Sequence, residues 1–280
     1  MLGKVVLREM KLTVLVDNWV TTPRAGLLGE WGYSALLTTP SGSLLIDTGE
    51  TGHTLLNNMR VLGLSPESVD CVALSHGHND HARGLPAFLE AAPQVRDRVF
   101  ASPLAVRERF EGQDLSPTGG AVLREVPLRP VQGAVELLPS VFAFDVPPEG
   151  RDPRYASRGL MYERGEDGTV RPDTFADDLS FLVRGPRGWA LLLGCAHAAL
   201  PNIVARVRDL FGVEQFELVA GGAHMMSLTP EEVEDWVTLM ASWRVRRWRL
   251  NHCTGFRAAA RLAQAHPDTD WAGVGSELAL

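Results

Sequence analysis

The stretch Leu74-Ser75-His76-Gly77-His78-Asn79-Asp80-His81-Ala82-Arg83-Gly84-Leu85 places three histidines and one aspartate within six positions. A mostly apolar run at 69–74 precedes the ligand-type residues, and a second apolar segment follows Gly84. This order predicts a buried strand, a tight loop and the start of a helix. Imidazole nitrogens and carboxylate oxygens are ligands that zinc and similar divalent cations prefer. The stretch therefore predicts a metal-binding loop at the end of a strand.

The spacing within this loop favours two neighbouring metals. His76 and His78 are two positions apart, so an extended loop directs both imidazoles to the same side. Asp80 and His81 are adjacent, so a turn can direct them at a second point. The alternative is a solvated loop that is rich in histidine by chance. With 8 histidines in 280 residues, three at these positions arise by chance in about 1 of 150 chains of this length, which favours the metal site.

The composition is that of an ordinary globular protein. The 280 residues are 45% hydrophobic and 22% charged, which allows one large domain or two small ones. A net charge of −7 gives no general attraction to nucleic acid or anionic membranes. No apolar run approaches the ~20 residues of a membrane span, and the N-terminus shows no signal peptide. Three well-separated cysteines argue against a disulfide framework. We therefore expect a cytoplasmic protein with a small-molecule substrate and no nucleic-acid or membrane partner, and a homo-oligomer remains possible.

Hydrophobic periodicity and turn residues predict alternating strands and helices along most of the chain. Strands are expected at 11–17, 33–38, 43–47, 69–74, 98–101, 179–183, 189–193, 216–220 and 248–250. Helices are expected at 54–62, 86–91, 104–110, 201–211, 230–241 and up to residue 265. Alternating apolar segments at 121–145 predict strands of a second sheet. Residues 146–175 lack periodicity and are rich in arginines and acids, which fits equally a lid with arginines that grip an anion and a solvated excursion.

Three more histidines each follow an apolar strand and lie close to a glycine: His197, His224 and His252. Strand ends meet at one edge of a sheet, where binding sites are usually built. We therefore expect His197 and His252 to contact the metals directly. For His224, a contact with the substrate is favoured over direct metal binding.

These motifs together resemble the metallo-β-lactamase superfamily. Within it, the chain is similar to the metal-dependent hydrolases related to the dihydropterin-ribofuranosylaminobenzene-phosphate synthase. The resemblance is carried by residues 12–18, 45–49, 74–85, 193–197, 221–224 and 251–255. It implies an α/β (α+β) fold, the four-layer αβ/βα sandwich of two mixed sheets with helices outside. It also implies a single domain over residues 1–280, with a lid or insertion at about 146–175.

The resemblance implies ligands for two divalent metal ions at three of these motifs, 74–85, 193–197 and 251–255. His76, His78 and His197 would hold one metal, and Asp80, His81 and His252 would hold the second. Zinc is the expected metal, and Mn²⁺ or Fe²⁺ is compatible with the same ligands.

One position departs from the pattern of the superfamily. Most members have an aspartate after the glycine of the 193–197 motif, and that aspartate bridges the metals. Cys195 stands there in this chain. It could be a thiolate ligand or a small buried residue, and the second interpretation is favoured. Asp177 and Asp178 precede a strand where many relatives carry a ligand histidine, so either carboxylate could reach the site.

These features favour a binuclear metallohydrolase, or a related transferase, that uses a metal-activated hydroxide. Asp80 would bind a metal and orient the water, His224 would contact the substrate, and Asp47 would fix a ligand imidazole. The resemblance suggests a phosphorylated or pterin-like substrate. Trp19, Trp31 and Tyr33 lie in or beside the early loop and could stack on such a substrate, but core packing is the favoured role. The alternative function is an iron-containing redox or metal-sensing protein of the same fold.

Overall fold

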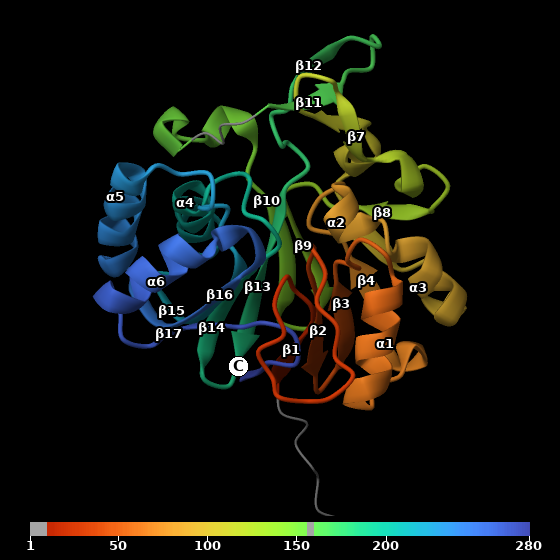
Figure 1. Cartoon of the computed structure of the whole chain (residues 1–280), viewed down its shortest axis with the longest axis horizontal. Coiled ribbons are helices and arrows are strands. Elements are labelled where there is room, and N and C mark those ends of the chain that lie inside the picture. The colour runs from red at the N-terminus through yellow and green to blue at the C-terminus, as the bar shows by residue number, and fades with distance from the viewer. Residues whose placement is uncertain (1–9, 156–159) are drawn as a thin grey trace, which may run out of the picture.

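Two seven-stranded mixed sheets form the centre of the computed structural model, which describes residues 10–155 and 160–280 (Figure 1). In the first sheet, β18 to β3 pair antiparallel and β3 to β8 pair parallel. Its order is β18 (Glu277–Ala279), β1 (Lys11–Val16), β2 (Ser34–Thr39), β3 (Gly42–Ile46), β4 (Cys71–Ala73), β5 (Val99–Ala101) and β8 (Leu128–Pro130).

In the second sheet, β14 to β17 pair parallel and β14 to β9 pair antiparallel. Its order is β17 (Thr269–Trp271), β16 (Arg244–Asn251), β15 (Gln215–Gly222), β14 (Gly188–Leu193), β13 (Leu179–Gly185), β10 (Val141–Asp145) and β9 (Ala134–Leu138). The predicted hairpins at 33–47 and 179–193 are confirmed as β2–β3 and β13–β14.

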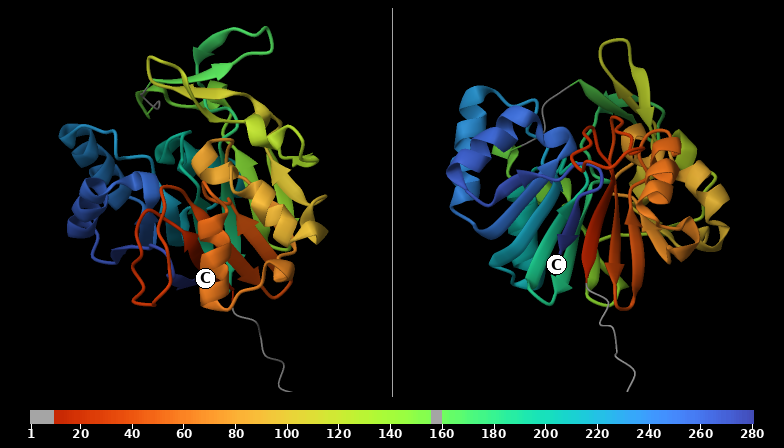
Figure 2. Two further views of the ribbon diagram at one scale, coloured as in Figure 1. Left: turned by 45° about the vertical axis from the view of Figure 1, so that its right-hand side comes forward. Right: turned by 60° about the horizontal axis from the view of Figure 1, so that its bottom comes forward.

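Helices cover the outer face of each sheet, so the molecule has four layers, as the right view of Figure 2 shows. The first sheet is covered by α1 (His53–Leu62), α2 (Asn79–Ala82) and α3 (Leu85–Ala91). The second is covered by α4 (Leu200–Phe211), α5 (Pro230–Ala241) and α6 (Phe256–Ala265). Three apolar clusters fill the spaces between the layers. The predicted αβ/βα sandwich is therefore confirmed.

The alternation of side chains along each strand explains why the sheets are buried on both faces. On β14, Ala190 and Leu192 belong to the cluster between the sheets, whereas Leu191 and Leu193 belong to the cluster under the helices. Successive side chains of a strand point to opposite faces, so a continuous apolar run fits this central position. The carboxyl ends of β3, β4, β14, β15 and β16 lead to the loops that carry the predicted site residues.

One expectation about the middle of the chain is wrong, and another, strands of a second sheet at 121–145, is correct only in part. The helix expected at 104–110 is instead a 3₁₀ turn at Pro103–Val106 followed by strand β6 (Arg109–Glu111). Pairing of β6 with its neighbours overrides the helical spacing of the apolar residues. Of the segments at 121–145, β8 joins the first sheet through β5, whereas β9 and β10 join the second.

The segment 146–175 contributes to a third, four-stranded sheet beside the loop after β4, at the top of Figure 1. Its order is β12 (Val170–Pro172), β11 (Met161–Arg164), β6 and β7 (Ser116–Gly119). Within this segment, 156–159 lie outside the described residues, as do residues 1–9, where no signal peptide was expected. Among the described helices, none combines the length and apolar character needed to cross a bilayer.

Candidate metal centre

The predicted first group of ligands, His76, His78 and His197, forms a buried cluster that we call the first triad. His76 and His78 lie in the loop after β4, and His197 lies in the loop after β14. His76 Nε2 is 3.0 Å from His78 Nδ1. The His197 ring centroid lies 4.7 Å from that of His76 and 4.9 Å from that of His78. One ring nitrogen from each residue lies within 4.8 Å of the others, so the three could hold one ion.

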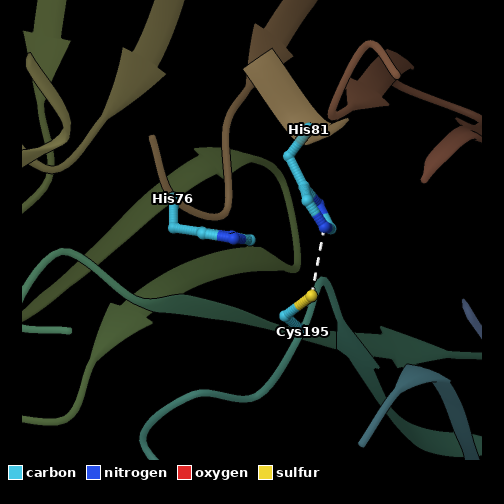
Figure 3. A group of neighbouring side chains, drawn as sticks. All are labelled: His76, His81 and Cys195. Atoms are coloured by element: carbon cyan, nitrogen blue, oxygen red, sulfur yellow. Dashed lines mark hydrogen bonds between the residues drawn. The ribbon is translucent and has the colours of Figure 1, made fainter. Parts of the chain in front are cut away.

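The predicted second group, Asp80, His81 and His252, also lies together, and we call it the second triad. His81 Nε2 is 3.2 Å from His252 Nε2. Asp80 Oδ2 is 3.4 Å from His252 Nε2 and 3.7 Å from His81 Nε2. The ligand atoms lie within 4.8 Å of one another. The His76 and His81 rings are 4.2 Å apart, so the two triads are neighbours (Figure 3).

The donor set fits a pair of divalent cations. His78 Nε2 and both ring nitrogens of His197 are buried without a hydrogen-bond partner. Buried polar atoms normally have partners, so these nitrogens point to a missing ligand. Burial and the neighbouring histidines lower the pKa of His76 and His197, and burial lowers that of His78 to about 3. The three imidazoles of the first triad are therefore neutral, the form that binds metals.

Asp47 occupies the supporting position that the sequence predicts for it. Its carboxylate lies 2.7 Å from His81 Nδ1 and accepts 2.7 Å hydrogen bonds from the amide and the hydroxyl of Ser75. The Ser75 hydroxyl also lies 2.9 Å from His76 Nδ1. Asp47 thus orients His81 directly and His76 through the Ser75 hydroxyl. In both histidines the contact is made by Nδ1, so Nε2 faces the centre.

His252 has a similar support that sequence reasoning missed. Asp17 Oδ1 accepts the His252 amide at 2.8 Å, and Asn18 Oδ1 lies 3.0 Å from His252 Nδ1. Asp17 and Asn18 follow the apolar strand β1. The signal that singled out Asp47, a polar residue at the end of a buried strand, could have found them.

The comparisons with known proteins agree with this architecture. The family model of the metallo-beta-lactamase superfamily matches residues 32–150. The crystal structure of Tm1679, a metal-dependent hydrolase of the beta-lactamase superfamily, is similar over 97% of this chain and 99% of that chain, with 26% identity and a TM-score of 0.78. In sequence and in fold, the chain therefore resembles the metallo-β-lactamase superfamily.

Two curated relatives from Methanocaldococcus jannaschii extend the similarity. The 7,8-dihydropterin-6-methyl-4-(beta-D-ribofuranosyl)-aminobenzene-5'-phosphate synthase is 24% identical over 77% of this chain and 76% of its own length. An uncharacterised protein is 26% identical over 90% of this chain and 94% of its own length. The predicted resemblance to this superfamily and to the synthase is therefore confirmed.

Asp177 and Asp178 accept hydrogen bonds from the backbone of the two loops that carry the first triad. Asp177 accepts the Gly77 amide at 2.8 Å and pairs with Arg109 at 2.7 Å. Asp178 accepts the Ala198 amide at 2.9 Å. Neither belongs to a candidate metal group among the described residues. These aspartates thus hold the backbone between His76 and His78 and just after His197.

Cys195 and His224 lie inside the cluster. Cys195 lies in the loop after β14, and its sulfur is 3.1 Å from Nε2 of His81, which follows the loop after β4 (Figure 3). The His224 ring centroid is 4.3 Å from that of His197, and its Nδ1 is buried without a partner. His224 and His252 have φ values of 48° and 49°, which side chains other than glycine rarely adopt. Such strained backbone is common where a site over-determines the position of a side chain.

A cleft of about 490 Å³ opens onto this centre. Trp31 lines it, is 53% exposed, and its ring centroid is 5.3 Å from that of His252. Trp19 is also half exposed. The predicted role in core packing is therefore wrong for Trp19 and Trp31, and it is confirmed for Tyr33, which is fully buried. Leu160 and Met161, from the predicted lid segment, contribute to the same cleft.

Of the two roles left open for the 146–175 segment, the anion grip is not supported by its described arginines, because none of them lines the cleft. Arg151 donates to three backbone carbonyls, and Arg154, Arg164 and Arg171 pair with carboxylates. Arg158 lies outside the described residues. Among the described residues that line the cleft, none is a lysine or an arginine. A smaller cavity of about 370 Å³, lined by Arg154, adjoins the cleft at His197 and His224.

Proposed function

We propose that this protein is a binuclear metal-dependent hydrolase, or a closely related transferase, that acts on a small molecule. One observation carries the proposal: two triads of metal-ligand side chains, drawn from both halves of the chain, lie side by side beneath a cleft. The first triad would hold one divalent cation and the second triad the other, with zinc expected and Mn²⁺ or Fe²⁺ compatible. Such a pair supplies a Lewis acid and a hydroxide nucleophile at neutral pH.

The protein's own groups prepare the site for this chemistry. Burial raises the pKa of Asp80, but His81 and His252 lower it by more. The pKa therefore lies below its ordinary value, and the carboxylate is ionised. It can therefore bind a cation and accept a hydrogen bond from the attacking water. His224 lines the cleft with an unpartnered Nδ1, which suits it to hydrogen-bond a substrate or leaving group.

The substrate is proposed to be phosphorylated or pterin-like. The name of the related synthase, which contains a dihydropterin and a phosphate, supports this class. The exposed ring of Trp31 beside the centre supports a flat group in the cleft. The cytoplasmic location, the lack of nucleic-acid or membrane partners and any homo-oligomer remain predictions of the sequence.

Elemental analysis of the purified protein tests the metal pair, followed by a screen of phosphate esters and cyclic phosphodiesters. About two zinc, manganese or iron atoms per chain are expected, with turnover of at least one ester. One metal or none after resupply would overturn the binuclear site. A coloured iron protein without esterase turnover would instead favour the redox alternative.

The His78→Ala variant tests whether the first triad performs the reaction. We expect turnover to be abolished while circular dichroism remains native, because a ligand is lost without a large cavity. His53→Ala is the matched control, since His53 is an exposed histidine at the start of α1. A folded, metal-depleted His78→Ala protein with full activity would contradict the proposal.

A further inference from the structure

We propose that the Cys195 thiolate is a seventh protein ligand and bridges the two metals. This inference rests on the metal pair of the proposed function but not on the reaction or the substrate. It reverses the interpretation that the sequence favoured, in which Cys195 is only a small buried residue. The site would consequently prefer metals that bind sulfur, such as zinc, cobalt and iron, over magnesium.

The position of the sulfur carries the proposal. Cys195 Sγ lies within 4.8 Å of ligand nitrogens of His76 and His81. Two further candidate groups place it equally close to His197 and to His252. Its neighbours therefore include members of both triads, as a bridging ligand requires. Packing alone does not require the sulfur of a buried cysteine to lie this close to four imidazoles.

The backbone around Cys195 holds the sulfur in this position. The Cβ that any other residue would add at Gly194 would lie 2.1 Å from the Ser75 hydroxyl, so only glycine lets the two loops approach this closely. Ala196 has a φ of 55°, which turns the chain sharply after Cys195. The carbonyl of Cys195 accepts the Cys253 thiol at 3.4 Å, which leaves the Cys195 sulfur directed at the centre.

A second, independent observation points to a ligand at the same place. His197 is 4% exposed, and neither of its ring nitrogens has a hydrogen-bond partner. It shares a candidate group with Cys195. Zinc accepts sulfur at about 2.3 Å and imidazole nitrogen at about 2.0 Å, so both residue types suit one ion. On metal binding the thiol proton leaves to solvent, and the resulting thiolate becomes the ligand.

The test loads the full-length protein with Co²⁺ and records its absorption in the near ultraviolet. We expect a thiolate-to-cobalt charge-transfer band in the wild type, and its loss in Cys195→Ser. The band should persist in Cys71→Ala, because Cys71 is a buried cysteine of β4 in the cluster between the sheets. It should also persist in Cys253→Ser, which removes the other nearby thiol. A band that is absent from the wild type, or present in Cys195→Ser, overturns the proposal.

X-ray absorption of the zinc-loaded Cys253→Ser protein provides a measurement that needs no change at Cys195. A bridging thiolate gives about one sulfur per zinc at about 2.3 Å. About half a sulfur per zinc would mean that Cys195 binds only one of the two metals. No sulfur would mean that Cys195 binds neither. Either result overturns the bridge. These readouts do not depend on turnover. Failure to find a substrate would therefore count against the proposed function and leave the bridge standing.

Discussion

Asp47 shows how much of the centre depends on one carboxylate outside the two triads. It accepts both hydrogen bonds that Ser75 offers and lies 2.7 Å from His81 Nδ1. Its φ of 55° lies in the left-handed region, which asparagine tolerates better than most residues. An asparagine can therefore replace it with the backbone unchanged, which isolates the role of the charge.

We expect Asp47→Asn to lower zinc affinity by roughly 10–100-fold, because an uncharged amide supports the His81 imidazole less well. Competition with a chromophoric chelator measures this affinity. Asp70→Asn is the matched control, since Asp70 also accepts a backbone amide, that of Ser43, at the other end of the strands. Equal zinc affinity of the two variants would show that Asp47 does not act on the metal.

Asp178 makes the stability of the metal-free protein depend on pH. Burial raises its pKa from 3.8 to about 7, so the folded state holds a proton that the unfolded state has lost between these values. Its contribution to stability is therefore present below about pH 4 and is lost as the pH rises to 7.

Asp178→Asn keeps an acceptor for the Ala198 amide but cannot ionise. Relative to this variant, the wild type should lose free energy of unfolding between pH 4.5 and 7, at about 1.4 kcal/mol per unit of pKa shift. Urea denaturation of both metal-free proteins measures the difference. A difference that stays constant over this range would contradict the expectation.

At the scale of elements, Arg109 joins the small third sheet to the metal loop. Its side chain is 1% exposed and pairs with Asp173 at 3.1 Å and with Asp177 at 2.7 Å. Asp177 in turn accepts the amide of Gly77, between the first two ligand histidines. Strand β6 therefore fixes the loop after β4 through a chain of charged hydrogen bonds.

We expect Arg109→Ala to cost about 3–5 kcal/mol of unfolding free energy, because two carboxylates would remain buried without their partner. The control is Arg164→Ala, which removes a 41% exposed arginine paired with Glu108 on the same sheet and should cost less than about 1 kcal/mol. Urea denaturation compares the two. Similar losses in both variants would mean that Arg109 is not the link between these elements.

At the scale of the whole molecule, the metals would join the two halves of the sandwich. The first triad combines the loop after β4 in the first sheet with the loop after β14 in the second, and the second triad reaches the end of β16. Without a metal, the unpartnered histidine nitrogens stay buried at this junction. A bound ion therefore stabilises the folded chain as a whole.

Removal of metal by a chelator should lower the midpoint of thermal unfolding. Ligand at 100 times its dissociation constant contributes about 2.7 kcal/mol, and each kcal/mol shifts the midpoint by about 2–4 °C in a protein of this size. Zinc should restore the midpoint, whereas magnesium should not, because it prefers oxygen ligands. Calorimetry measures both effects. An unchanged midpoint in a demonstrably metal-free protein would contradict this expectation.

The sequence by itself determined most strands of the two main sheets, the order of the loops that follow them and six candidate ligand side chains. Those signals are local. An apolar run predicts a buried strand, and a histidine or aspartate directly after it predicts a site residue at the end of that strand. The superfamily resemblance assigned these ligands to two groups, and the geometry places each group together.

Only the tertiary structure decided which side chains lie among the candidate ligands and which ones support their loops. The direction of the Cys195 sulfur, the support of Gly77 by Arg109 and Asp177, and the exposure of Trp31 each depend on packing between segments far apart in the chain. The strand β6 likewise replaced an expected helix because its pairing partners lie elsewhere in the sequence. Local periodicity carries no information about such contacts, since their free energy is gained only when the layers assemble.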